Sequence, residues 1–125
     1  MARKTTSRSK PDVTIFHNPS CGTSRKVLQT IRDAGYKPKV VEYLKAGWRR
    51  EQLDSLLERM GLKARDILRV RGTQAQELGL TAAGTTDAAI LAAMVADPSL
   101  VERPIVIGPR GVVLCRPPEQ VSTVL

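Results

Sequence analysis

The stretch "DVTIFHNPSCGTSRKVLQTIRDAG", residues 12–35, predicts a strand, a turn and a helix in direct succession. Residues 12–16 are rich in β-branched side chains, which favours a buried strand. After the turn, apolar residues recur at helical spacing until Gly35, a natural helix stop. A second strand is predicted at residues 39–44. Strand, helix and strand in this order indicate a right-handed unit with parallel strands.

The middle of the chain is predicted to be helical. Leucines at helical spacing indicate a helix that ends at Gly61. Short helical pieces are expected at residues 64–69 and 75–78. Either Thr86 or Asp87 caps a further helix, whose apolar side chains again recur at helical spacing.

The last third returns to strands. Runs at residues 104–107 and 112–116 flank the turn sequence "GPRG", residues 108–111, so we expect an antiparallel hairpin. A short helix follows the two prolines at 117–118. The fold class is therefore α/β: a thioredoxin-like four-stranded mixed sheet flanked by helices, with a helical insertion between the βαβ and ββα halves.

The length of the chain and the distribution of its charges indicate how its domains are organised. The chain has 125 residues and a net charge of +8. We expect a single domain at residues 12–125. Residues 1–11 form a basic leader that has no acidic residue and no periodicity, and we expect it to be disordered.

Composition excludes several classes of partner. Only 3% of the residues are aromatic, too few to form stacking platforms for single-stranded nucleic acid. No apolar run approaches the ~20 residues of a membrane span, and no signal peptide is recognisable. We expect a cytoplasmic protein with neither nucleic acid nor membrane as its partner.

The cysteines indicate one reactive thiol. Two cysteines and one histidine make a poor zinc set, so no metal site is expected. Cys21 lies at the start of the predicted helix, where free backbone N–H groups and the helix dipole favour a thiolate. Arg25, four residues further on, could add a positive charge. Cys115 is interpreted as a small core side chain.

The residues that follow Cys21 exclude two classes of thiol-based active site. Ser24 stands where a dithiol redox site would carry its second cysteine, so an adduct on Cys21 needs an external thiol for its resolution. A phosphatase-type C-x5-R loop is excluded because position 27 is valine. The remaining prediction is a monothiol nucleophile.

Four other residues are candidates for the same site. Arginine binds tetrahedral oxyanions through two hydrogen bonds at once, so arginines at element ends could form an anion site if they converge. These are Arg69, Arg103 and Arg116. His17, which follows the first predicted strand, could either support a thiolate or cap the turn.

Four motifs in this order resemble the glutaredoxin-coupled bacterial arsenate reductases. They are "NPSCGTSR" (18–25), "DILR" (66–69), "RPIV" (103–106) and "LCRP" (114–117). The resemblance extends from about residue 13 to about residue 124.

This resemblance implies reduction of arsenate to arsenite. Cys21 matches the family's catalytic cysteine, whose thiolate attacks arsenic and forms a covalent thiol–arsenate adduct. Glutathione, a co-substrate, adds to the adduct, and glutaredoxin accepts the glutathione as a mixed disulfide. Arsenite is then released from Cys21 by hydrolysis. No bound cofactor is implied.

The resemblance also implies roles for other residues. Arg69, Arg103 and Arg116 match the family's anion-binding triad. Pro104 matches a position that thioredoxin-like proteins usually hold in the cis form, and His17 has a counterpart near the thiolate. At Arg71 the chain carries a cation where the family pattern has a neutral polar residue.

Two alternatives remain open. A glutathione-dependent monothiol reductase with another substrate would share this fold and a similar cysteine. A redox-regulatory thioredoxin-like binding protein, acting through RNA polymerase contacts, would typically carry a C-x-x-C switch, which Ser24 interrupts.

Overall fold

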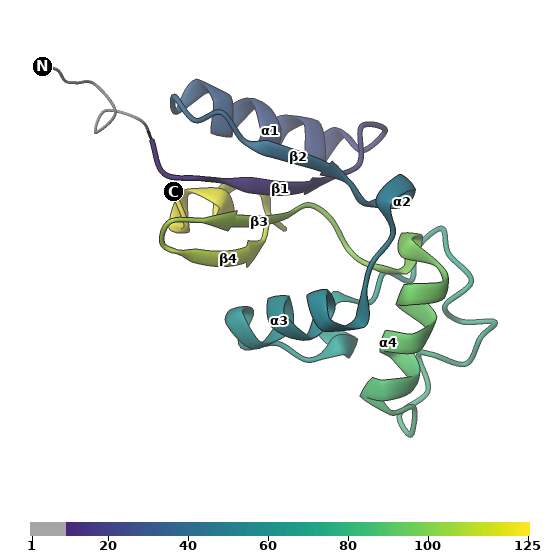
Figure 1. The fold of residues 1–125 in the computed structure, drawn as a ribbon. Coiled ribbons are helices and arrows are strands. Elements are labelled where there is room, and N and C mark those ends of the chain that lie inside the picture. The colour runs from purple at the N-terminus through teal and green to yellow at the C-terminus, as the bar shows by residue number, and fades with distance from the viewer. Residues whose placement is uncertain (1–9) are drawn as a thin grey trace, which may run out of the picture.

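A four-stranded mixed sheet forms the centre of the protein, as predicted (Figure 1). The computed structural model describes residues 10–125. The strand order is β2-β1-β3-β4, in which β1 pairs parallel with β2 and antiparallel with β3, and β3 pairs antiparallel with β4. The strands are β1 (Thr14–His17), β2 (Lys39–Glu42), β3 (Ile105–Gly108) and β4 (Gly111–Leu114).

Helices cover both faces of this sheet. One face carries α1 and the C-terminal 3-10 helix η4, while α3 and α4 lie on the other side (Figure 1). The α-helices are α1 (Gly22–Asp33), α2 (Tyr43–Ala46), α3 (Arg50–Met60) and α4 (Asp87–Ala96). The 3-10 helices are η2 (Ala64–Ile67), η3 (Pro98–Leu100) and η4 (Pro118–Thr123). The thioredoxin-like arrangement with a helical insertion is therefore confirmed.

Two apolar clusters hold the three layers together. Successive side chains of a strand point to opposite faces, so Ile15 and Phe16 enter different clusters. Ile15 packs with α1 and η4, whereas Phe16 packs with the insertion and Trp48. The phenyl and indole rings lie 5.0 Å apart. The sheet is thus buried on both sides, which fixes its ends relative to the helices.

The strand register collects four chain segments at one edge of the sheet. His17, the last residue of β1, pairs with Glu42, the last residue of β2. Phe16 pairs with Ile105 at the start of β3, and Ile105 pairs with Leu114 at the end of β4. The residues that follow β1, β2 and β4 and those that precede β3 therefore lie at the same edge.

Some predicted boundaries were wrong. The second strand ends at Glu42, because the chain turns there into α2 and sends Tyr43 into the core against Trp48. Residues 75–78 form turns rather than a helix, closed by Gly79 with φ of 74°. Of the two caps that the sequence offers for α4, the structure confirms Thr86, whose hydroxyl accepts a hydrogen bond from the Ala89 N–H at 3.1 Å.

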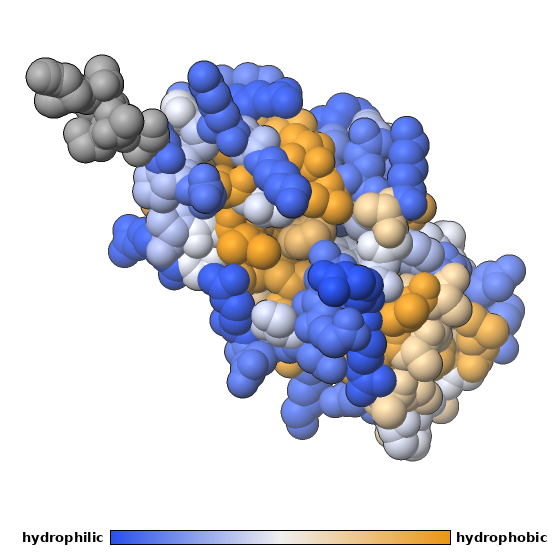
Figure 2. Space-filling model, in the orientation of Figure 1, coloured by the Kyte–Doolittle hydropathy of each residue, from blue (hydrophilic) through white to orange (hydrophobic). Residues whose placement is uncertain are grey.

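The face of the molecule drawn in Figure 2 is mostly hydrophilic. Figure 2 shows apolar surface in the middle of one face, framed by polar side chains, and a second apolar area over α4. Within the described part of the chain, no helix is long and apolar enough to cross a membrane. Except for Lys10 and Pro11, the leader predicted for residues 1–11 lies outside the described residues.

Candidate active site

Cys21 occupies the N-cap position of α1, as the sequence predicts. The turn between β1 and α1 is closed by the Cys21 N–H, which donates to the Asn18 carbonyl at 3.0 Å. The Cys21 carbonyl in turn accepts the first helical hydrogen bond, from the Arg25 N–H at 3.0 Å. The thiol is half-buried. It is therefore held by the backbone at the positive end of a 12-residue helix.

The surroundings of Cys21 lower the pKa of its thiol. Partial burial alone would raise the pKa, because it disfavours the charged form. The N–H of Ser24, the guanidinium of Arg103 and the N–H of Thr23 outweigh that effect by stabilising the thiolate. A low thiol pKa is characteristic of reactive cysteines at helix N-termini.

Ser24, at the position of the missing second cysteine, is fully buried and braces the turn. Its Oγ lies 2.7 Å from His17 Nδ1 and accepts a hydrogen bond from the Asn18 N–H at 3.1 Å. Burial lowers the pKa of His17, so the ring is neutral near neutral pH. Of the two interpretations of His17, the contacts match the structural one: it stabilises the turn through Ser24.

Arg25 makes a different contact from the expected one. Its Nη1 donates to the Pro19 carbonyl at 2.8 Å, so the side chain clamps the turn. The cation that acts on the Cys21 thiolate is Arg103.

Arg103, which acts on the Cys21 thiol, and Pro104 directly precede β3. The bond between them is cis, as the resemblance implies. The Pro104 carbonyl accepts a hydrogen bond from the Cys115 N–H at 2.9 Å, which fixes this segment to the end of β4. The Arg103 Nε is buried and has no hydrogen-bond partner among the described residues.

Arg69 lies beside this group but already has an acidic partner. An isolated bridge between Leu68 and Val101 aligns its segment with the one that leads to Arg103. The Arg69 Nη1 donates to Glu102 Oε1 at 2.8 Å, and the two side chains are 17% and 25% exposed. Arg71 is exposed. Glu102 therefore neutralises one predicted anion ligand in the structure.

Arg116 lies on the outer side of the site. It is exposed, and its Nη1 donates to the Arg103 carbonyl at 3.1 Å. The structure thus brings Arg103 to the thiol, Arg69 to the neighbouring segment and Arg116 to the backbone of Arg103. The three predicted arginines gather at one edge of the sheet, and they differ in their present partners.

Sequence reasoning missed Asn18, Glu102 and Tyr43. Asn18 is buried, and its Oδ1 accepts a hydrogen bond from the Ser20 N–H at 2.9 Å. Glu102 directly precedes Arg103 in the sequence, and this adjacency could have indicated that a carboxylate lies close to the candidate anion site. Tyr43 lies within residues 39–44, where the sequence predicts a strand, and that pattern gives no sign that the charges of Cys21 and Arg103 act on its hydroxyl.

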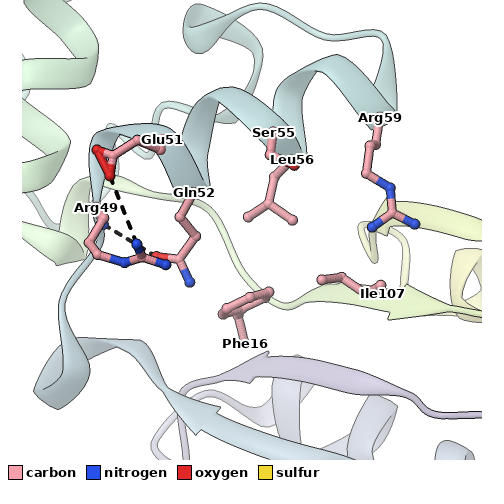
Figure 3. Close-up of a pocket in the computed structure, with 8 residues that line it drawn as sticks. All are labelled: Phe16, Arg49, Glu51, Gln52, Ser55, Leu56, Arg59 and Ile107. Atoms are coloured by element: carbon pink, nitrogen blue, oxygen red, sulfur yellow. Dashed lines mark hydrogen bonds and ion pairs between the residues drawn. The ribbon is translucent and has the colours of Figure 1, made fainter.

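A cavity of about 310 Å³ lies elsewhere, between α3 and the sheet (Figure 3). Its floor includes Phe16, Leu56 and Ile107, and Arg49 and Arg59 stand at its rim. None of the predicted site residues lines it. Within residues 10–125, no three His, Cys, Asp or Glu side chains are grouped as metal ligands would be.

Comparisons with known proteins agree on one family. The model of the ArsC family matches residues 16–124. Arsenate reductase ArsI2 of Synechocystis sp. is 52% identical over 113 residues, which cover 90% of this chain and 81% of that protein. The arsenate reductase of Escherichia coli K12 is 41% identical over 114 residues, covering 91% and 81%. The solved structure of an arsenate reductase from Vibrio cholerae matches with a TM-score of 0.88 at 36% identity, covering 94% of this chain and 100% of that one.

Proposed function

The chain belongs to the ArsC family, and from this premise we propose that it reduces arsenate to arsenite with Cys21 as the nucleophile. The observation that carries the proposal is the thiol at the N-cap of α1 beside Arg103. Together, the helix N-terminus and the guanidinium lower the thiol pKa. The same groups suit a tetrahedral oxyanion, which both helix N–H groups and guanidinium can bind.

The first proposed step is a substitution at arsenic. The Cys21 sulfur donates an electron pair to As(V), one As–O bond breaks, and the oxygen leaves as water after protonation. Arg103, and Arg69 and Arg116 after reorientation, would balance the negative charge on the remaining oxygens. No electron transfer occurs in this step, since arsenic stays As(V) in the adduct.

Reduction follows with two external thiols, because Ser24 cannot act as a resolving thiol. Glutathione adds to arsenic and a second water leaves. A glutaredoxin thiolate then attacks the glutathione sulfur, and the electrons of the S–As bond remain on arsenic as As(III). The two external thiols are oxidised to one mixed disulfide. Water then displaces arsenite from Cys21. We place this reaction in the cytoplasm, where glutathione keeps thiols reduced.

The test is a coupled assay that follows arsenate-dependent consumption of a reductant. Wild type should turn over with glutathione and glutaredoxin, and Cys21→Ser should be inactive because a serine hydroxyl is not ionised at neutral pH. Full activity of Cys21→Ser would overturn the assignment of the nucleophile.

Two further versions of the assay test the thiol donor and the substrate. Replacing glutathione and glutaredoxin by thioredoxin tests the donor, and equal turnover with thioredoxin alone would contradict the proposed resolving steps. Reduction of a glutathione mixed disulfide without any response to arsenate would identify a monothiol reductase of another substrate instead.

A further inference from the structure

The Tyr43 hydroxyl has no hydrogen-bond partner among residues 10–125. The side chain is 1% exposed, and its ring stacks on Trp48 at a centroid distance of 5.4 Å. The hydroxyl oxygen is buried, and no group of the described residues completes a hydrogen bond with it. An unpaired buried hydroxyl destabilises the folded state, and a phenylalanine would fill the same space without that cost. Packing therefore explains the ring and leaves the hydroxyl unexplained.

The fold places this hydroxyl at the edge where Cys21 lies. Tyr43 directly follows Glu42, which pairs with His17, so it sits beside the turn that carries the cysteine. The charges that act on the hydroxyl come from Arg103, Cys21 and Arg69. The Asn18 side chain also lies close to the hydroxyl and acts to lower its pKa, although the two groups do not complete a hydrogen bond. The three charged groups are those that the proposed reaction assigns to the nucleophile and the anion.

A second donor in the same group also lacks an acceptor. Three buried side-chain donors have no partner among the described residues: the Tyr43 hydroxyl, the Arg103 Nε and the Trp48 Nε1. Of these, Arg103 also acts directly on the Cys21 thiol. Buried polar groups are nearly always hydrogen-bonded, so two unpaired donors near one reactive thiol indicate a missing acceptor. A tetrahedral oxyanion offers several acceptor oxygens and could pair with both.

We propose that the Tyr43 hydroxyl donates a hydrogen bond to an oxygen of the arsenate bound at Cys21, and so is a substrate-binding residue. The inference rests on the proposed function, which supplies the anion. Burial raises the pKa of Tyr43, so the phenol stays protonated and remains a donor near neutral pH. An acceptor with a negative charge makes such a bond stronger than a neutral one.

The test compares Tyr43→Phe with Tyr36→Phe. Tyr43→Phe keeps the ring that packs on Trp48 and removes only the hydroxyl. Tyr36, outside this edge, is half-buried with the Lys10 ammonium 4.9 Å from its ring centroid, and serves as the matched control. We expect kcat/KM for arsenate to fall about tenfold in Tyr43→Phe, with Tm equal to or above that of wild type. Tyr36→Phe should keep wild-type kcat/KM.

Stability and activity together decide the outcome. A structural hydroxyl would lower Tm in Tyr43→Phe along with activity, and that result overturns the proposal, as does an unchanged kcat/KM. Arsenate binding is also measured by calorimetry with Cys21→Ser and with Cys21→Ser/Tyr43→Phe, where weaker binding to the double variant supports the proposal. If wild type does not reduce arsenate, the proposed function fails, and this titration still decides the role of Tyr43: equal binding, or none, overturns it.

Discussion

The two cysteines of the described chain lie in opposite environments. Cys21 stands at a helix N-terminus beside a guanidinium, and the pKa of its thiol is lowered. Cys115 follows β4, is fully buried among apolar side chains, and burial raises its pKa to about 12. Both sulfurs are partly or wholly withdrawn from water, so burial alone does not separate them. The difference comes from what replaces the water: N–H groups and a cation at Cys21, and hydrocarbon at Cys115.

This contrast explains how a single thiol can suffice. The turn that holds Cys21 is braced by Ser24, and the arginines proposed as anion ligands lie in other segments of the chain. The Cys115 N–H bonds the Pro104 carbonyl and so helps fix that second group of segments. In the proposed reaction Cys21 is the nucleophile, whereas Cys115 contributes packing and a backbone contact.

The largest expected effect separates the two cysteines directly. Cys21→Ala should reduce arsenate turnover to background, because the nucleophile is lost. Cys115→Ala should keep kcat within about twofold and lose about 1 kcal/mol of unfolding free energy, since only a small buried group is removed. Kinetics and urea unfolding of both variants check this. Comparable losses of activity in the two variants would contradict the assignment of Cys21 as the nucleophile and Cys115 as a structural residue.

Arg103→Ala tests what lowers the pKa of Cys21. Removing the guanidinium takes away a stabilising charge, so the pKa of the thiol should rise and the pH profile of kcat/KM should move to higher pH. Loss of a charge-assisted contact predicts a fall of about 10- to 100-fold at neutral pH. Arg110→Ala, in the exposed turn between β3 and β4, is the control and should leave both unchanged. A profile that stays in place would show that Arg103 does not act on the thiol.

Ser24→Ala tests the brace of the turn. The change leaves His17 Nδ1 and the Asn18 N–H buried without their hydrogen-bond partner, which should lower the free energy of unfolding by about 1–3 kcal/mol. Activity should fall about fivefold, because Cys21 is held less firmly while its own contacts remain. Ser122→Ala, on the exposed surface of η4, should change stability by less than about 0.5 kcal/mol. Equal Tm values for the two variants would contradict a bracing role.

Glu102→Gln should produce the smallest change, in the direction of a gain. The carboxylate neutralises Arg69, so its removal should lower KM for arsenate by about twofold to fivefold with little change in kcat. Glu51→Gln, which removes an exposed ion-pair partner of Arg49, is the matched control. An unchanged or higher KM in Glu102→Gln would show that the ion pair does not compete with the anion.

Local patterns were enough to predict the fold and the position of Cys21. The strand, the turn and the helix each depend on residues close together in the sequence, so residues 12–35 alone predict that Cys21 lies at the start of the helix. The resemblance implied the arginines, and the cis bond before Pro104 matches it. The environment of Cys115 was also predictable, because it lies in an apolar run.

Contacts across the chain were not predictable from such patterns. The ion pair of Arg69 with Glu102 joins residues 33 positions apart. The turn of the chain at Tyr43 depends on packing against Trp48, which strand propensity at residues 39–44 does not reveal. Helical spacing predicts that Arg25 faces the thiol, but its guanidinium donates a hydrogen bond to the Pro19 carbonyl, a contact within the turn that spacing does not reveal.

The most direct test of the account measures alkylation of each cysteine in the folded protein as a function of pH, resolved by mass spectrometry. The account predicts that Cys21 reacts with a midpoint below the ordinary cysteine pKa of about 8.5, since its thiolate fraction rises as pH passes through the lowered value. It also predicts that arsenate slows this reaction and that Cys115 stays unmodified. A Cys21 midpoint at or above the ordinary value, or equal labelling of both cysteines, would contradict it.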